Sequence, residues 1–164
     1  VGSLHEGFPL ADVLSRDGYN AFVLHYRTGG PTVAYEDMAA ALSWIFRHAE
    51  KLETSTHGYS LWGGSAGARM AADLGSYGAA AFGGDRVPRP ATVVMAYTGH
   101  TRYTENDPPT FAVVSQDDPI ASPHVMERRI AALNAAGVDT EFHLYRNAGH
   151  GFGVGTGTDA EGWM

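Results

Sequence analysis

The chain has 164 residues, of which 44% are hydrophobic and 18% charged, a balance typical of a globular protein with one buried core. Its formal net charge of −7, with no basic cluster, argues against a nucleic-acid or anionic-membrane surface. No apolar run approaches the length of a transmembrane span, and the absence of cysteine excludes disulfides, thiolate catalysis and cysteine-based metal sites.

The first part of the chain alternates predicted helices with a predicted strand. Apolar residues share one face of a short helix expected over residues 9–15, which Gly18 ends. Residues 19–26 (YNAFVLHY) are apolar at nearly every position, which predicts a parallel strand buried on both faces. Apolar residues then recur every three or four positions over residues 33–52, and this period predicts a helix.

The stretch YSLWGGSAGARM, residues 59–70, organises the rest of the chain. A short apolar run ends in G-x-S-x-G, and small residues and good helix formers follow, which is the strand, turn and helix of a nucleophile elbow. We expect the turn to strain Ser65, and a side chain at Gly63 or Gly67 to collide with the neighbouring strand or helix. The backbone N–H of Ala66, at the helix start, would then face a developing oxyanion.

The second half of the chain continues the alternation. The elbow helix is expected over residues 66–74, residues 75–90 are expected to be irregular, and a helix is expected over residues 123–136. Three further apolar runs are predicted strands, residues 92–97, 110–114 and 140–145. Strands that alternate with helices predict an α/β fold with a mostly parallel sheet.

Three chemically active side chains follow the ends of predicted strands. Ser65, the pair Asp117 and Asp118, and His150 occur in the chain order Ser, Asp, His. Because parallel strands place their carboxyl ends at one edge of the sheet, we expect these side chains to meet there. The remaining histidines show no metal-ligand spacing, so neither a metal ion nor a cofactor is expected.

With these residues identified, the chain resembles the α/β-hydrolase superfamily, esterase/lipase type, and more narrowly the small acetyl-xylan-esterase-like carboxylesterases. Four segments carry the resemblance: GYNAFVLHYR, LWGGSAGARMA, VVSQDDPIASP and NAGHGFG. The resemblance implies a single α/β-hydrolase domain over residues 1–164, with a mostly parallel sheet flanked by helices.

The resemblance also implies roles for particular residues. Ser65 would be the nucleophile, His150 the general base and Asp118 the acid that orients the imidazole. The family usually has glycine at the strand end where this chain has Ser115, so Asp117 remains an alternative acid.

The ends of the chain depart from the family. The resemblance starts after the HGGG-type loop that supplies other oxyanion donors, and the three strands before that loop and most of the helix after Trp163 have no counterpart. We therefore expect a fragment of a hydrolase or a shortened gene product. One missing strand would lie between residues 19–26 and 59–62, so those two segments should not be hydrogen-bonded, and the isolated chain should express poorly or associate.

The resemblance implies a serine carboxylesterase that uses a Ser-His-Asp triad on small acyl esters of the acetyl type, carbohydrate esters included. The alternatives are an impaired or non-catalytic hydrolase-fold fragment acting as a binding module, and a peptidase of the same fold. The expected partner is a small-molecule or carbohydrate ester, with no nucleic acid and no membrane, and an oligomer is compatible with the sequence. A cytoplasmic location is favoured because the given chain contains no signal peptide.

Overall fold

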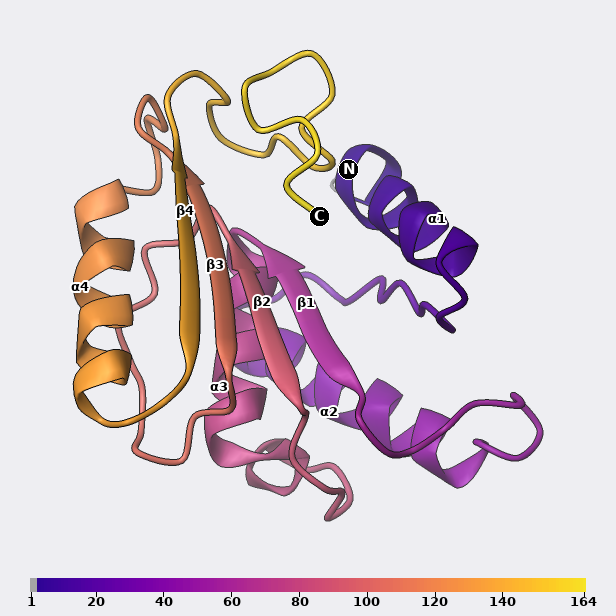
Figure 1. Cartoon of the computed structure of the whole chain (residues 1–164). Helices are drawn as coiled ribbons and strands as arrows, with labels where there is room; N and C mark the ends of the chain where they lie inside the picture. Colours follow the sequence, from indigo (N-terminus) through magenta and orange to yellow (C-terminus); the bar gives the residue numbers. More distant parts are fainter. Residues whose placement is uncertain (1–2) are drawn as a thin grey trace.

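The computed structural model describes residues 3–164 and is built around a parallel sheet (Figure 1). Four strands lie in the order β1-β2-β3-β4: β1 (Ser60–Gly64), β2 (Thr92–Ala96), β3 (Thr110–Ser115) and β4 (Thr140–Tyr145). Each neighbouring pair is parallel. All four carboxyl ends therefore reach the same edge of the sheet, where ligands bind in open α/β folds.

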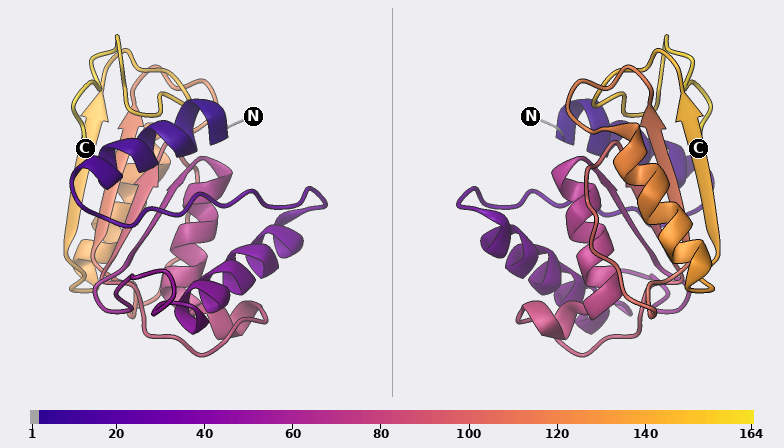
Figure 2. Two further views of the ribbon diagram at one scale, coloured as in Figure 1. Left: turned by 90° about the vertical axis from the view of Figure 1, so that its right-hand side faces the viewer. Right: turned by 90° about the vertical axis from the view of Figure 1, so that its left-hand side faces the viewer.

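Helices cover the sheet and its flank (Figures 1 and 2). They are η1 (Ser3–Gly7), α1 (Phe8–Arg16), α2 (Pro31–Arg47), α3 (Ala66–Tyr77), η2 (Ala79–Phe82) and α4 (Pro123–Ala135). Helix α3 packs on β1 and β2, α4 packs on β3 and β4, and α2 packs on α3 and η2. Helix α1 lies beyond β1, on the side of the molecule away from β4 (Figure 1). No helix within residues 3–164 is long and apolar enough to cross a membrane.

The core lies where the two central strands meet the helices. The side chains of β2 and β3 are almost fully buried, as are the apolar residues of α3 and α4 that face them. The most deeply buried of these are Val93, Met95, Val113, Val114, Leu74, Met126 and Leu133. A strand that has a neighbouring strand on each side and helices packed on its faces consists almost entirely of apolar residues. For this reason the apolar runs in the sequence predict β2 and β3.

Most predicted elements are confirmed. The strands predicted over residues 92–97, 110–114 and 140–145 correspond to β2, β3 and β4 within a residue at either end. The short first helix and the helix before Gly137 correspond to α1 and α4. The mostly parallel α/β fold is therefore correct for the chain.

The strand predicted over residues 19–26 is wrong, because no strand is present there. The segment runs between α1 and α2 on the β1 side of the sheet (Figure 1), yet among the described residues β1 pairs only with β2. The expectation that residues 19–26 and 59–62 share no ladder is thus confirmed. An apolar run forms a strand only when a neighbouring strand accepts hydrogen bonds from its N–H groups and donates hydrogen bonds to its carbonyls. The sequence of the run does not show whether such a neighbour is present.

Two predicted helix boundaries and one loop are also corrected. The helix predicted over residues 33–52 is Pro31–Arg47, followed by turns in which Glu53 has a positive φ of 51°. The elbow helix runs past residue 74 to Tyr77, and the segment predicted as irregular contains η2. Gly75, which suggested a break, instead lets α3 approach β2, because a Cβ built there would lie 2.7 Å from the Val93 side chain.

Candidate active site

Ser65 lies in a strained turn between β1 and α3. Its φ of 51° and ψ of −113° are uncommon for a residue with a side chain. The turn is fixed by the backbone, since the Ser65 N–H donates to the Ala96 carbonyl at 2.9 Å and the Ser65 carbonyl accepts from Arg69 N–H at 3.3 Å. The hydroxyl therefore stands at the carboxyl edge of the sheet, next to the N-terminus of α3.

Two glycines before the serine make this turn sterically possible. A Cβ at Gly63 would lie 2.1 Å from the backbone carbonyl carbon of Gly67, so β1 and α3 could not approach as they do. A Cβ at Gly64 would lie 2.6 Å from the Tyr97 ring. At Gly67 a Cβ would meet nothing within 4 Å, so the expected collision at Gly67 is wrong. The requirement for glycine falls on the strand side of the turn.

We expect Gly63→Ala to lower the free energy of unfolding by at least about 2 kcal/mol, because the added methyl overlaps backbone that cannot move aside easily. Gly67→Ala is the matched control, with open space and better helix propensity, and should change stability by no more than about 1 kcal/mol, toward greater stability. Urea unfolding at pH 7 measures both. Equal effects of the two substitutions would contradict this account of the turn.

Three side chains from the carboxyl ends of three strands form a continuous hydrogen-bonded chain. His150 Nε2 lies 3.0 Å from Ser65 Oγ, and His150 Nδ1 lies 2.8 Å from Asp118 Oδ2. Asp118 Oδ1 also accepts the backbone N–H groups of Ile120 at 2.7 Å and Ala121 at 2.8 Å. The Asp118 side chain is fully buried and that of His150 is 16% exposed. The structure thus brings together Ser65, His150 and Asp118, the second of the two aspartates that strand-end placement indicated.

Asp117 faces away from the imidazole and ties two loops together. It accepts hydrogen bonds from the Ser115 hydroxyl and from the Gly149 N–H at 2.9 Å. The Ser115 hydroxyl in turn accepts the Ala148 N–H at 2.8 Å. The Ser115 hydroxyl and then the Gly149 N–H hold the pKa of Asp117 below its ordinary value. Asp117 therefore stays ionised and anchors the loop that carries His150.

Ser115→Ala should lower the free energy of unfolding at pH 7 by about 1–3 kcal/mol, because the part-buried Ala148 N–H then loses its hydrogen-bond partner, the hydroxyl of the fully buried Ser115. The substitution should also change the acid response. The pKa of Asp117 in the folded protein lies below the ordinary 3.8. The contribution of Asp117 to the free energy of unfolding is therefore fully present above pH 3.8 and is lost as the pH falls through the lowered pKa. Urea unfolding between pH 2 and 7 should show a smaller loss in the variant, and an unchanged pH dependence would contradict the role of Ser115.

Tyr97 is a residue of the site that the sequence does not reveal. It directly follows β2, is 1% exposed and has a φ of 38°, which is rare for a bulky residue. Its ring packs edge to face against the His150 imidazole, with 5.2 Å between the ring centroids. It packs in the same way against the Phe152 ring, with 4.7 Å between the centroids. Burial, and next the Glu6 carboxylate, raise the pKa of Tyr97, so its hydroxyl stays neutral. The Tyr97 ring covers one side of the His150 imidazole. The only sequence signal for this contact is Gly64, whose missing side chain makes room for the ring.

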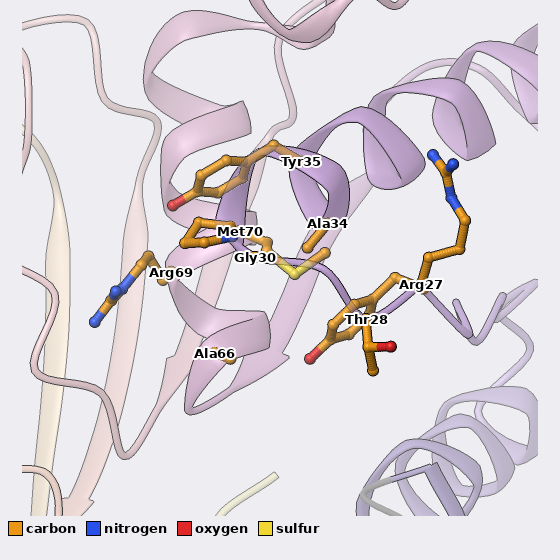
Figure 3. A pocket seen from close by; sticks show the side chains of 10 residues that line it. Arg27, Thr28, Gly30, Ala34, Tyr35, Ala66, Arg69 and Met70 are labelled. Atoms are coloured by element: carbon orange, nitrogen blue, oxygen red, sulfur yellow. The ribbon is translucent and has the colours of Figure 1, made fainter.

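Ala66, the expected oxyanion donor, is the exposed first residue of α3, and it lines a cavity together with the loop before α2 and the start of α2 (Figure 3). No group of three His, Cys, Asp or Glu side chains within residues 3–164 is arranged to hold a metal ion. What the site offers is a serine hydroxyl, an imidazole bonded to a buried carboxylate and a helix N-terminus.

A parallel sheet with helices around it and a serine in a strained turn between strand and helix defines a serine hydrolase of the α/β-hydrolase class. The chain belongs to the BD-FAE family, whose model matches residues 7–89. That match includes Ser65 but ends before Asp118 and His150. None of the curated proteins matches the chain.

Solved structures show the same fold. The acetyl ester-xyloside bifunctional hydrolase from Caldicellulosiruptor lactoaceticus is 21% identical, with a TM-score of 0.80 over 90% of this chain and 68% of that one. The α/β hydrolase MGS-M1 from a Medee basin deep-sea metagenome library is 25% identical, with a TM-score of 0.78 over 94% and 68% of the two chains. The carboxylesterase Cest-2923 from Lactobacillus plantarum WCFS1 is 18% identical, with a TM-score of 0.76 over 97% and 76%.

Proposed function

We propose that the protein is a serine carboxylesterase that hydrolyses esters of small acyl groups such as acetate, acetylated carbohydrates included. The observation that carries the proposal is the unbroken hydrogen-bonded chain from Ser65 through His150 to Asp118. Membership of the BD-FAE family and the esterase activity named for two similar structures support it.

In the proposed acylation step, His150 Nε2 accepts the proton of Ser65 as the hydroxyl attacks the ester carbonyl. Asp118 fixes the tautomer of the imidazole and stabilises the imidazolium through its bond to Nδ1. The backbone N–H of Ala66 donates to the oxyanion, where the helix N-terminus favours negative charge. The imidazolium then protonates the departing alcohol.

In the proposed deacylation step, water takes the place of the alcohol beside His150. The imidazole accepts a proton from this water as it attacks the acyl carbon, and the tetrahedral intermediate collapses with return of the proton to Ser65. The carboxylic acid leaves and the site returns to its starting state. The Tyr97 ring, which packs against the imidazole, keeps His150 within reach of the Ser65 hydroxyl in both steps.

The proposal is tested with the purified protein, 4-nitrophenyl acetate, an acetylated xyloside and a panel of peptide nitroanilides. We expect hydrolysis of the acetate esters and none of the peptides. Hydrolysis of peptides in preference to esters would assign a peptidase of the same fold. A folded protein that binds these compounds without cleaving any would be a binding module instead.

A further inference from the structure

The beginning of the chain packs against the loop that follows β4 and carries His150. Figure 1 shows the first helices beside the loop at the C-terminal end of the chain. A Cβ built at Gly153 would lie 2.7 Å from the His5 carbonyl oxygen, and one built at Gly151 would lie 2.9 Å from Glu6 Oε1. The backbone just after the histidine therefore lies directly on η1, and the Glu6 carboxylate lies against it.

The Tyr97 side chain lies between Glu6 and the His150 imidazole. Its ring packs edge to face on the imidazole, and its hydroxyl faces the Glu6 carboxylate. Burial first, and then the charge of the Glu6 carboxylate, raise the pKa of this hydroxyl, whereas a hydrogen bond from the Gly153 N–H acts in the opposite direction. One end of Tyr97 thus contacts η1 and the loop, and its ring contacts the imidazole.

The position of Tyr97 affects the whole loop that carries the histidine. Three groups of this loop contact the Tyr97 side chain: the His150 imidazole, the Phe152 ring and the Gly153 N–H. The backbone of Tyr97 is strained, with a φ of 38°, and a strained residue keeps its place only where its surroundings hold it. Glu6 is the group at the hydroxyl end of Tyr97 that comes from outside this loop.

We infer that Glu6 is a positioning residue for the proposed reaction, because it accepts the Tyr97 O–H and so fixes the ring on which the imidazole packs. The inference rests on the proposed function. The fixed imidazole keeps its Nε2 at 3.0 Å from Ser65 Oγ, the distance that proton transfer needs. Glu6 therefore acts on kcat rather than on substrate binding.

The first test compares kcat and KM for 4-nitrophenyl acetate among folded variants. Glu6→Ala should lower kcat about 10- to 100-fold, as a displaced catalytic group does, and leave KM within about twofold. Glu6→Gln keeps an acceptor oxygen at the same place and should retain kcat within about threefold of the wild type. Asp12→Ala is the matched control, since it removes a carboxylate of α1 that pairs with Arg16 at 2.7 Å, and it should change neither constant.

A double variant shows whether Glu6 acts through Tyr97. Tyr97→Phe keeps the ring, removes the hydroxyl and should lower kcat at least as much as Glu6→Ala does. The double variant should be no slower than Tyr97→Phe alone, because both substitutions break the same contact. Effects that multiply would overturn the inference. Glu6→Met keeps the length of the side chain without its oxygens, so it serves if Glu6→Ala does not fold.

A second readout needs no turnover. The proton on His150 Nδ1, held by Asp118 at 2.8 Å, should give a far-downfield proton NMR signal in the wild type and in Glu6→Gln. In Glu6→Ala this signal should broaden or vanish through exchange with water at the same temperature. An unchanged signal and an unchanged kcat in Glu6→Ala would each overturn the inference. A wild type that cleaves no ester would overturn the esterase proposal, whereas the NMR comparison would still decide whether Glu6 positions His150.

Discussion

Replacing Ser65 by alanine or His150 by glutamine should lower kcat for 4-nitrophenyl acetate on the order of 10⁴-fold or more. Without the hydroxyl no acyl-enzyme forms, and without the imidazole the hydroxyl keeps its proton at neutral pH. Because the two groups act as a unit through their 3.0 Å contact, the double variant should be little worse than either single one. Stopped-flow absorbance at 400 nm measures the burst and the steady rate.

Labelling by a fluorophosphonate gives a second measurement that needs no turnover. The wild type should gain one label on Ser65, and His150→Gln should gain none over the same time. Ser60→Ala is the matched control, since Ser60 lies at the start of the same strand and should label and turn over as the wild type does. Labelling that survives His150→Gln would mean that this histidine does not activate the serine, and the proposed mechanism would fail.

Asp118→Asn should lower kcat by about 10³- to 10⁴-fold while the protein stays folded, in line with the same change in serine proteases. The carboxylate that accepts the Nδ1–H would become an amide that can present an N–H, so the neutral imidazole would favour the wrong tautomer. Asp117→Asn is a control one residue away, on a carboxylate that contacts Ser115 and Gly149 rather than the ring. It should change kcat by less than about tenfold.

The pair of variants separates chemistry from support of the loop. For Asp118→Asn we expect an almost unchanged KM, and for Asp117→Asn we expect a loss of stability in urea that exceeds the loss in rate. If Asp117→Asn were the more damaging substitution for kcat, Asp117 would be the orienting acid and the hydrogen bond seen at Asp118 would not be the productive one. Circular dichroism of each variant checks the fold.

Much of the fold follows from the order of residues alone. Strands β2 and β3 are buried on both faces, so their apolar runs are unbroken, and turns rich in glycine and polar residues bound them. The elbow is equally local, because a strand, a glycine turn and a helix are consecutive in the chain. Ser65 and His150 could be named as candidates for that reason: Ser65 immediately follows β1, and His150 lies in the loop after β4, which ends at Tyr145.

Other features depend on what a segment meets. Residues 19–26 have the composition of a buried strand, yet they pair with no strand among the described residues. The local sequence does not show whether a pairing partner is present. Gly63 and Gly67 look equivalent in G-x-S-x-G, and only the close approach of β1 to α3 shows that Gly63 alone is confined. The left-handed backbone of Tyr97 is likewise a consequence of packing.

The sequence by itself determined the α/β class and the parallel sheet, and it indicated Ser65 and His150 as candidate site residues, because apolar runs and turn residues that mark strand ends are local features of the chain. Only the tertiary structure decided which of two adjacent carboxylates contacts the imidazole and which aromatic residue packs against that imidazole. It also decided where the cavity lined by Ala66 lies. Each of these depends on the direction of a side chain leaving a loop. That direction is set by hydrogen bonds such as Asp118 to Ala121 and Asp117 to Gly149, the second of which joins residues far apart in the chain.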